Sequence, residues 1–453
     1  MNLPDYFIAD LPAGATLGPT MIREACQTLK RNRQTYLADR STPRLIRILG
    51  RLAEEWLQPE YRFRRLALER GPAATGFPVK TLARGLDSFF RQLTEPNLRA
   101  LLLHELGHVQ RLDGMAATAL EVEGGRAAVV KGPAMLAHIA AGNIPNPTLL
   151  SMVLGLLTHS AQFVKCARGT SLLPRLFAHS LYEVEPKLAA CLEIAEWEGG
   201  SAALETPLFE EADCVTATGS DETLASIRRC VPSGARFLGY GHRLSFGYIS
   251  REALFGSNIE TVLAHATHDI VAWNQLGCLS PHVLYVETGG GLTPVQFAAR
   301  LAEHLAQREQ EEPRGQIPLD TSATISFRRG FYEIRAAHSE QTRLWSSPDS
   351  TAWTVVYEDD PLFAVSCLHR FIHVKAASDL TRALQGADEV RRHISTVGLA
   401  APEDKAEALA LQLAHWGATR VCPLGRMQSP PLTWRHDGRP NLGDLVTWTD
   451  WEQ

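Results

Sequence analysis

Short β-rich runs alternate with helical segments from residue 127 to beyond residue 286, and this alternation constrains the fold more than any other feature. Four of these runs lie at 127–130, 163–166, 214–217 and 283–286. Such alternation is typical of βαβ units, which build a mostly parallel sheet with helices packed on its faces. The sequence therefore predicts an α/β protein.

One strand-to-helix junction can be predicted in detail. A strand at 282–286 runs into three glycines at 289–291, and a helix follows. Thr293 can cap that helix, Pro294 fits its first turn, and Gln296 can close a capping box. Three glycines could also cradle a phosphate, but no Lys-Ser/Thr pair follows them, so we expect a plain turn.

The segment from Pro19 to about Asp113 has a helical pattern. Apolar residues recur in it at three- and four-residue spacing, with Arg and Glu between them. The chain has no internal repeat, and its 453 residues suffice for two to three domains. We expect a helical region at 1–125, α/β domains at 126–250 and 251–425, and a C-terminal segment at 426–453.

Composition restricts the classes of partner. The net charge of -5 offers no support for binding to nucleic acid or to an anionic membrane. The N-terminus lacks a basic segment followed by an apolar run, and the apolar stretch 149–157 is too short to span a bilayer. The eight cysteines are scattered and contain no Cys-x-x-Cys pair, which suits a reducing compartment. We therefore expect a cytoplasmic protein without a membrane span.

His104-Glu105-Leu106-Gly107-His108 matches the His-Glu-x-x-His signature of zinc proteases. The extended signature needs a Gly and a third His at fixed offsets, and neither follows here. Residues 120–125 resemble a strand ending in a turn, so Glu121 or Glu123 would reach the site only on a second helix. We therefore favour a structural helix over a zinc site and assign no metal ligand.

Cys278 is the candidate nucleophile. It lies in Gln-Leu-Gly-Cys-Leu-Ser-Pro (275–281), with a small residue before it and a turn-forming Ser-Pro after it, directly ahead of a strand. A constrained turn at a strand edge can present the sulfur to a cleft, where its thiolate is nucleophilic. An isolated cysteine is more often a buried apolar side chain, so the assignment depends on the residues that accompany it.

Two polar segments follow predicted strands. Asn143 lies in a turn-rich patch, where its amide could donate a hydrogen bond to an oxyanion or satisfy its own backbone. Lys165 and Arg168 lie just past a strand end, where open α/β sheets bind ligands. These cations could meet ribose and phosphate oxygens, or they could be a solvated pair.

Two further segments add candidates. Gly219 and Ser220 occupy a strand-to-helix turn whose N–H groups would suit a pyrophosphate, unless Ser220 merely caps the helix. His242 stands among glycines in Gly-Tyr-Gly-His-Arg-Leu-Ser (239–245). An imidazole titrates near neutral pH, so His242 is a candidate for proton handling, although it could equally stabilise a glycine-rich turn.

Four motifs carry a family resemblance: Gly-Asn-Ile-Pro (142–145), Val-Lys-Cys-Ala (164–167), Gly-Tyr-Gly-His-Arg-Leu-Ser (239–245) and Gln-x-x-Cys-x-Ser-Pro (275–281). Segments at 370–375, 419–425 and 434–446 add to it. In this order the motifs resemble the acyl-CoA reductases of the bacterial luminescence system (LuxC type), a branch of the aldehyde dehydrogenase superfamily. The resemblance is strong from about residue 125 onward and weak in the helical N-terminal part.

The resemblance implies an aldehyde dehydrogenase-like fold, with two open, mostly parallel α/β domains and a helical N-terminal region. It implies a cofactor domain at 126–250 and a catalytic domain at 251–425. Within these domains, Asn143 and the backbone N–H of Cys278 would form the oxyanion hole, and Lys165 would bind the adenosine ribose. Gly219 and Ser220 would lie at the pyrophosphate.

The chain departs from the superfamily at two places. Hydrolytic dehydrogenases carry a water-activating glutamate in a Glu-Leu-Gly-Gly segment, and here Gly-Tyr-Gly-His-Arg (239–243) stands in its place. The missing carboxylate fits an enzyme that reduces a thioester rather than hydrolysing it. The luminescence reductases also have an acidic residue where Asn274 stands. Lys165 and Arg168 together favour NADPH over NADH, because a 2′-phosphate attracts two nearby cations.

The resemblance thus implies an NADPH-dependent reductase that converts a fatty acyl thioester to an aldehyde through an acyl-Cys278 intermediate. The acyl donor would be acyl-CoA, a carrier protein or a partner enzyme such as an acyl-protein synthetase or acyltransferase, and we expect a homo-oligomer. Two alternatives are a CoA-acylating dehydrogenase that works in the oxidative direction and a non-catalytic scaffold of the same superfamily.

Overall fold

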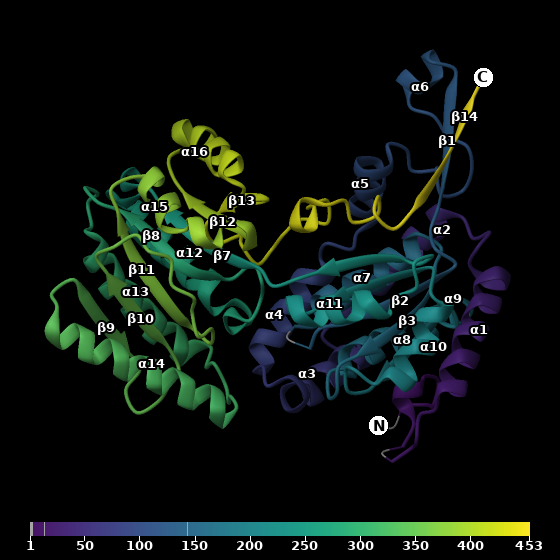
Figure 1. The fold of residues 1–453 in the computed structure, drawn as a ribbon, viewed down its shortest axis with the longest axis horizontal. Coiled ribbons are helices and arrows are strands. Elements are labelled where there is room, and N and C mark those ends of the chain that lie inside the picture. Colours follow the sequence, from purple (N-terminus) through teal and green to yellow (C-terminus); the bar gives the residue numbers. More distant parts are fainter. Residues whose placement is uncertain (1–2, 13, 143) are drawn as a thin grey trace. The chain divides into compact units, whose positions relative to one another are not determined.

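The computed structural model describes residues 3–12, 14–142 and 144–453. The polypeptide divides into two compact units (Figure 1). Unit 1 comprises Met1–Thr75, Leu82–Gly241 and Pro431–Gln453, and unit 2 comprises Gly76–Thr81 and His242–Pro430. The functional boundaries expected at residues 125, 250 and 425 remain predictions, whereas the packing of the chain places the passage from unit 1 to unit 2 at His242.

A five-stranded sheet forms the centre of unit 1. Its strand order is β4-β3-β2-β5-β6, and every neighbouring pair is parallel. The strands are β2 (Met135–Ile139), β3 (Ala161–Cys166), β4 (Leu192–Glu196), β5 (Cys214–Thr218) and β6 (Arg236–Tyr240). The chain order changes direction between β2 and β5, and open α/β sheets bind ligands at such a switch point, outside the carboxyl ends of the strands.

Helices cover both faces of this sheet. Ile22, Cys26 and Leu29 of α1 are buried in the core that α1 and α10 form with one face. Helices α7 and α8 pack against the strands and against α2. The helices up to β6 are α1 (Pro19–Tyr36), α2 (Thr42–Leu57), α3 (Arg62–Thr75), α4 (Val79–Phe90), α5 (Glu95–Leu106), α6 (Ala119–Glu123), α7 (Asn146–Leu157), α8 (Leu172–Val184), α9 (Pro186–Ala189), α10 (Ala202–Glu211) and α11 (Asp221–Cys230).

A two-stranded antiparallel ribbon joins distant parts of unit 1. Strand β1 (Arg126–Lys131) pairs with β14 (Thr447–Glu452) near the C-terminus (Figure 1). The strand predicted at 127–130 is therefore confirmed, but the strand predicted at 120–125 is wrong, because that segment contains helix α6. A reciprocal capping box explains the helix: Thr118 accepts from the backbone N–H of Glu121, whose carboxylate accepts from the backbone N–H of Thr118.

A seven-stranded sheet forms the centre of unit 2, in the order β13-β12-β7-β8-β11-β10-β9. All neighbours are parallel except β9, which runs antiparallel to β10 at one edge. The strands are β7 (Leu244–Ile249), β8 (Pro281–Glu287), β9 (Thr342–Ser346), β10 (Thr354–Glu358), β11 (Phe371–Ala377), β12 (Ile394–Ala400) and β13 (Arg420–Pro423). The two sheets confirm the predicted α/β class with mostly parallel strands.

Two buried cores sandwich the sheet of unit 2. One lies under α12 and α13, and the other under α15 and α16. The predicted start of α13 is confirmed, because Thr293 accepts from the backbone N–H of Gln296 and forms the capping box. The remaining helices are α12 (Asn258–Val271), α13 (Pro294–Glu311), α14 (Leu319–His338), α15 (Leu380–Gly386) and α16 (Glu403–Trp416), with short 3₁₀ helices η1 (Ile8–Asp10), η2 (Arg251–Leu254), η3 (Ala272–Gln275), η4 (Asp388–His393) and η5 (His436–Gly438).

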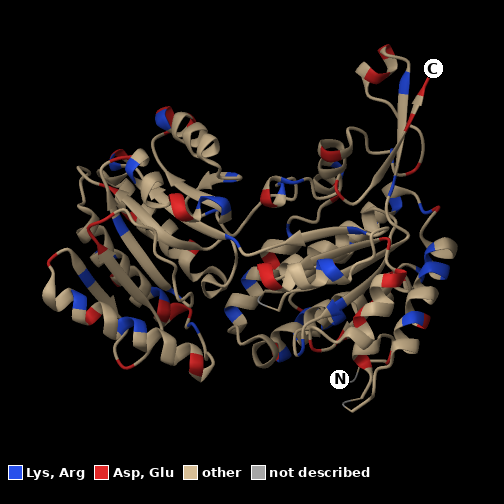
Figure 2. Cartoon of the chain, in the orientation of Figure 1, with Lys and Arg blue, Asp and Glu red and all other residues tan. Residues whose placement is uncertain are grey.

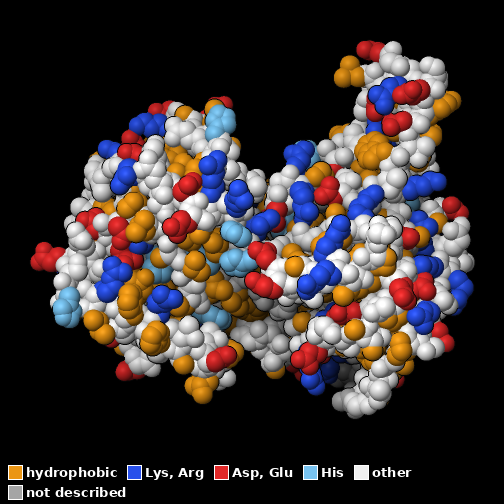
Figure 3. All heavy atoms as spheres, viewed as in Figure 1, with side chains coloured by type: hydrophobic (Ala, Val, Ile, Leu, Met, Phe, Trp, Pro, Cys, Tyr) orange, Lys and Arg blue, Asp and Glu red, His pale blue; other side chains and the backbone are white. Residues whose placement is uncertain are grey.

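The surface carries charges of both signs on both units (Figure 2). On the face drawn in Figure 3, hydrophobic side chains are scattered between acidic and basic ones. Within the described part of the chain, none of the helices combines the length and the hydropathy that a membrane span requires.

Candidate active site

Cys278 lies in a turn between η3 and β8, and its side chain is half-buried. The chain enters this turn through three consecutive residues with positive φ: Trp273 (51°), Asn274 (49°) and Gln275 (65°). Non-glycine residues rarely adopt this left-handed conformation, and each costs roughly 1–3 kcal/mol unless the surroundings impose it. The turn that carries the thiol is therefore held by contacts from outside it.

A second segment with left-handed backbone conformation provides some of the contacts that hold this turn. Leu368, His369 and Arg370 have φ values of 62°, 55° and 67°. The His369 backbone N–H donates to the carbonyl oxygen of Asn274 at 2.9 Å, and Arg370 Nε donates to Asn274 Oδ1 at 3.0 Å. Arg370 is fully buried and forms an ion pair of 2.6 Å with Glu309. Asn274 is thus a structural anchor of the turn.

Side chains from neighbouring strands fix the rest of the turn. Gln275 Nε2 donates to the carbonyl oxygens of Pro281 (2.8 Å) and Phe371 (3.0 Å). Ser245 Oγ, on β7, donates to the carbonyl oxygen of Cys278 at 2.8 Å. Since β7, β8 and β11 are parallel neighbours, their amino ends meet at one edge of the sheet, and Cys278 lies at that edge.

The other cysteines differ from Cys278 in their surroundings. Burial raises the pKa of four of them, Cys26, Cys166, Cys191 and Cys214, to about 12. Burial also raises the pKa of Cys422, to about 11. Burial also raises the pKa of Cys367. Cys230 is exposed near the end of a helix. Cys367 is also half-buried and comes just before the amino end of β11, so the features that distinguish Cys278 are its Gln-x-x-Cys-x-Ser-Pro motif and the clamped turn that leads to it.

His242 lies immediately before β7, so it belongs to the same sheet edge as Cys278. Its ring is exposed, and its centroid is 6.4 Å from that of His393, which precedes β12. Burial, together with a smaller effect of the nearby His242, lowers the pKa of His282, on β8, to about 4. The topology therefore gathers imidazoles along the edge that carries the thiol.

Asn143, the predicted oxyanion donor, lies outside the described residues. The residues around it follow the carboxyl end of β2 and precede α7. The backbone N–H of Ala140 donates to the carbonyl oxygen of Lys165 at 2.9 Å, which joins this loop to the end of β3. Asn146 starts α7 and donates from Nδ2 to the carbonyl oxygen of Gly85 at 3.0 Å.

Lys165 and Arg168 come together with this loop at the carboxyl end of β3. Lys165 is 3% exposed, and its Nζ is 5.9 Å from the ring centroid of Trp197. Burial lowers the pKa of Lys165, while nearby Glu205 and Glu196 act in the opposite direction. Arg168 is exposed, in a loop that Glu196 holds by accepting from the backbone N–H of Gly169 at 2.6 Å.

Gly219 and Ser220 connect β5 to α11 at the same carboxyl edge. Ser220 caps the helix, accepting from the backbone N–H of Thr223 at 3.3 Å. A Cβ at Gly219 would stand 3.3 Å from the Thr223 side chain, so the backbone approaches the helix closely. Since β3 and β5 flank β2, Lys165 and Ser220 lie on opposite sides of the switch point.

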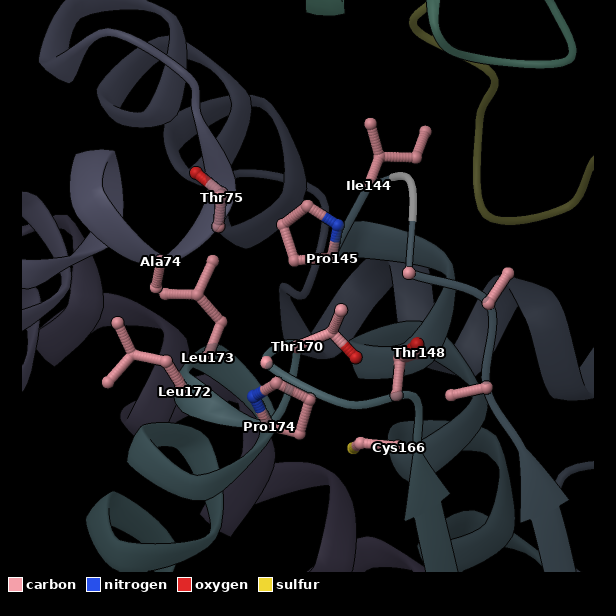
Figure 4. Close-up of a pocket in the computed structure, with 14 residues that line it drawn as sticks. Ala74, Thr75, Ile144, Pro145, Thr148, Cys166, Thr170, Leu172, Leu173 and Pro174 are labelled. Carbon is pink, nitrogen blue, oxygen red and sulfur yellow. The ribbon is translucent and has the colours of Figure 1, made fainter. Parts of the chain in front are cut away.

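A hollow of about 70 Å³ opens beside the loops that follow β2 and β3 (Figure 4). Its walls combine aliphatic side chains with threonine hydroxyls and belong to α3, α7, α8 and the connecting loops. The labelled residues that line it are Ala74, Thr75, Ile144, Pro145, Thr148, Cys166, Thr170, Leu172, Leu173 and Pro174.

The His-Glu-x-x-His segment has a structural role. Helix α5 ends at Leu106, and Gly107 caps it with a positive φ of 71°, so His104 and His108 do not share a helical face. The carboxylate of Glu105 accepts from three successive backbone N–H groups, those of Asn441, Leu442 and Gly443. The carboxylate that would activate water in a zinc protease thus anchors the C-terminal segment.

Several residues that position Cys278 have no signature in the sequence. Gln275 and Ser245 lie inside recognisable motifs, but nothing in those motifs shows that they bind backbone carbonyls of the turn. Arg370 also lies in a motif, and only its complete burial identifies it as an anchor. Gln428, which contacts the turn from a loop 148 residues away from Ser280, follows no pattern at all.

Comparison with solved structures defines the fold. The putative aldehyde dehydrogenase PutA from Anabaena variabilis is similar with a TM-score of 0.72 and 14% identity, over 96% of this chain and 93% of that one. PnpE in complex with nicotinamide adenine dinucleotide gives a TM-score of 0.69 at 16% identity, covering 96% and 90%. The fold is that of the aldehyde dehydrogenases, as predicted.

Sequence comparison defines the family. The model of the family "Acyl-CoA reductase (LuxC)" matches residues 37–448, so the chain belongs to this family and the predicted resemblance is confirmed. Long-chain acyl-protein thioester reductase 2 of Photobacterium leiognathi is 21% identical over 324 residues, which are 70% of this chain. The match spans less than two thirds of that relative, 63% of its length.

Proposed function

We propose that this protein reduces an activated fatty acyl thioester to the aldehyde with NADPH, through an acyl thioester on Cys278. Membership of the LuxC family and the aldehyde dehydrogenase fold support an oxidoreductase of this kind. The observation that carries the proposal is the position of Cys278, a half-buried thiol on a turn clamped by Asn274, Gln275 and Ser245.

The proposed reaction begins with transfer of the acyl group. The thiolate of Cys278 attacks the carbonyl carbon of the donor, a bond forms between that carbon and Sγ, and the donor departs as its own thiolate. Asn143 and the backbone N–H of Cys278 would stabilise the oxyanion, each with a contribution on the order of 3 kcal/mol. Ser245 holds the carbonyl oxygen of Cys278, and so it restrains the peptide that follows this residue and helps to keep it in place in the turn.

Reduction completes the proposed sequence. A bound reduced nicotinamide would supply the hydride that turns the acyl thioester into a thiohemiacetal. Collapse of that species breaks the bond to Sγ, releases the aldehyde and restores the Cys278 thiolate. His242 is the proposed residue for proton handling, and its place on the same sheet edge as Cys278 supports this role.

The proposed cofactor site lies at the carboxyl edge of the sheet in unit 1. Lys165 and Arg168 would meet the adenosine ribose and its 2′-phosphate, and Gly219 and Ser220 would lie at the pyrophosphate, although the backbone N–H of Gly219 itself donates to the carbonyl oxygen of Tyr240 at 3.2 Å. The chain fits such a group, because α11 presents its N-terminus there and Gly219 leaves the backbone uncovered by a Cβ.

The proposal includes two kinds of acyl donor. We infer that the donor is acyl-CoA or an acyl group carried by a protein, including a partner synthetase or acyltransferase. The relatives named acyl-protein thioester reductases favour a carrier of the second kind. A cytoplasmic homo-oligomer remains the expected form of the protein.

The decisive experiment is acyl labelling. Wild-type protein incubated with radiolabelled acyl-CoA should retain label that hydroxylamine removes, because hydroxylamine cleaves thioesters. The Cys278→Ala variant should retain none, and Cys230→Ala should label like the wild type, since Cys230 is an exposed thiol in the other unit. Addition of NADPH should then release the label as aldehyde.

Two outcomes would overturn the proposal. Label that persists on the Cys278→Ala variant would place the acyl group elsewhere. Label that NADPH releases as free fatty acid would mean hydrolysis instead of reduction. Faster formation of acyl-CoA from aldehyde, CoA and NADP⁺ than of aldehyde from acyl-CoA would favour the oxidative direction.

A further inference from the structure

A buried carboxylate lies behind the turn that carries Cys278. Asp269, in the last turn of α12, has no exposed surface and accepts from the backbone N–H groups of Gly425 and, at 3.1 Å, Met427. Burial raises the pKa of Asp269 to about 7, and the N–H groups of Gly425, Met427 and Gln428 act in the opposite direction. Desolvation of such a buried carboxylate costs several kcal/mol, and its hydrogen bonds to these N–H groups offset that cost, so the carboxylate and the segment it binds hold each other in place.

The segment bound by Asp269 is loop 424–428, which follows β13. Gly425 has a φ of +88°, and a Cβ there would stand 2.8 Å from the ring of His265, so the loop lies directly against α12. From the other side, Arg420 donates to the carbonyl oxygens of Arg426 (2.9 Å) and Met427 (2.7 Å). The loop is therefore held on its N–H groups by a carboxylate and on its carbonyls by a guanidinium.

Loop 424–428 ends against the turn that carries the thiol. Gln428 Nε2 donates to Ser280 Oγ, and Ser280 is fully buried. A Cβ at Gly277 would stand only 2.8 Å from Gln428 Oε1, so the Gln428 side chain packs directly against the backbone at Gly277. Gln428 thus contacts the turn on both sides of Cys278, at Gly277 and at Ser280.

Arg420 also interacts electrostatically with Cys278. Burial lowers the pKa of Arg420, and Cys422, Asp269 and Cys278 raise it. The thiol of Cys278 therefore lies within the electrostatic reach of the guanidinium that holds the loop. All of these residues belong to unit 2, so the connection from Asp269 to Cys278 is made within one compact body.

We infer that Asp269 is a positioning residue for Cys278, acting through loop 424–428 and Gln428 on turn 277–280. The inference rests on the proposed function for its catalytic consequence, because the position of the sulfur matters when it must meet an acyl carbon and an oxyanion hole together. A displacement of about 1 Å at such a site can lower a rate about a hundredfold.

The test compares three variants with the wild type. Asp269→Asn keeps the size of the side chain but replaces one acceptor oxygen with a donor, and Gln428→Met keeps the length but removes the hydrogen bond to Ser280. Glu287→Gln is the matched control, because Glu287 is a buried carboxylate at the opposite end of β8, bound to Tyr248 and Arg251.

Three measurements are made on each protein. Hydrogen–deuterium exchange of the amides in 277–280 should accelerate about fivefold or more in Asp269→Asn and Gln428→Met, because the turn loses its outer support. Acyl transfer to Cys278 should slow about tenfold to a hundredfold in both variants, with the affinity for NADPH unchanged. Glu287→Gln should match the wild type in all three respects.

The outcomes separate this inference from the proposed function. Unchanged exchange in 277–280 for both variants would overturn the link between Asp269 and the turn. Faster exchange with an unchanged rate of acyl transfer would overturn the positioning role. If wild-type Cys278 takes no acyl group, the proposed function fails, and the exchange of the amides in 277–280 then decides the link between Asp269 and the turn by itself.

Discussion

Ser245 and Cys278 are joined by a hydrogen bond of 2.8 Å from the serine Oγ to the cysteine carbonyl oxygen. The same Oγ accepts from the backbone N–H of Thr396 at 3.2 Å, so one buried hydroxyl connects β7, β12 and the turn of the thiol. We predict that Ser245→Ala slows acyl transfer to Cys278 about tenfold, because the turn loses a contact and two buried backbone groups lose their partner.

The rate is measured by single-turnover labelling with acyl-CoA, and unfolding in urea reports the loss of stability separately. We expect a loss of about 1–3 kcal/mol from the unpaired backbone groups. The control is Ser250→Ala, a buried serine just beyond the opposite end of β7. Equal labelling rates for Ser245→Ala and the wild type would contradict the prediction.

Gly277 and Gln428 provide a second prediction, through steric coupling. The nearest atoms to a Cβ at Gly277 all belong to Gln428, the closest at 2.8 Å. Gly277→Ala should therefore slow acyl transfer in the wild type but do much less harm in a Gln428→Ala background, where the methyl group has room. We expect a coupling of about 1 kcal/mol in the double-mutant cycle, measured on unfolding and on the labelling rate.

The control for this cycle is Gly330→Ala. Gly330 lies within α14, and a Cβ there would meet no atom within 4 Å. Alanine at this position should leave acyl transfer unchanged and stabilise the helix by about 0.5–1 kcal/mol. Additive effects of Gly277→Ala and Gln428→Ala would show that the two residues do not restrain each other.

The cofactor preference gives a third prediction. Arg168 is exposed beside Lys165, at the edge where the 2′-phosphate of NADPH is proposed to bind. Arg168→Ala should raise the KM for NADPH on the order of tenfold, a loss of about 1.4 kcal/mol, and leave the KM for NADH nearly unchanged. Arg229→Ala, an exposed arginine at the far end of α11, is the control.

Equal effects on the two cofactors would contradict the role given to Arg168. They would mean that the guanidinium meets a group shared by NADH and NADPH, such as the pyrophosphate. In that case the preference for NADPH would lose its basis in this pair of cations, while the nicotinamide site itself would stand.

Much of the fold was predictable because local pattern and tertiary structure agree. The strand predicted at 283–286 lies within β8, and Thr293 caps the helix after it, since both signals are contained in a few consecutive residues. The wrong prediction at 120–125 arose where two local signals disagree. The alternation there favours a strand, but the capping box of Thr118 and Glu121 decides for a helix.

The site was predictable only in part. Motif order made Cys278 the candidate nucleophile, which stays a prediction, but the left-handed conformation of Trp273, Asn274 and Gln275 contradicts the local preference of these residues, so no sequence pattern predicts it. The contacts that impose it come from distant segments, such as Arg370, which lies 96 residues from Asn274. Asp269 did leave a trace: it is the one carboxylate in the last two turns of α12, directly before the buried Ile270 and Val271.

His138 gives the last prediction, which concerns stability against pH. Its ring is buried on β2 between Thr216 Oγ1 (2.7 Å from Nδ1) and Gln162 Oε1 (2.9 Å from Nε2). Since the Gln162 oxygen can only accept, Nε2 carries the proton and Nδ1 accepts from the Thr216 hydroxyl. Burial lowers the pKa of His138 to about 4, because the protonated, charged ring would lack solvation by water.

In the unfolded chain the same imidazole takes up a proton near pH 6.5, so the native state loses stability as the pH falls from 6.5 toward 4. The contribution of the neutral His138 ring to the free energy of unfolding is fully present above pH 6.5. The lowered pKa corresponds to a loss of this free energy on the order of 3 kcal/mol as the pH falls to about 4. Urea unfolding at pH 7.5, 6.0 and 5.0 should show His138→Gln less stable than the wild type at pH 7.5 but with a shallower decline. His415→Gln, at an exposed position, should keep the wild-type slope, and an equally steep decline in His138→Gln would mean that other groups carry the acid sensitivity.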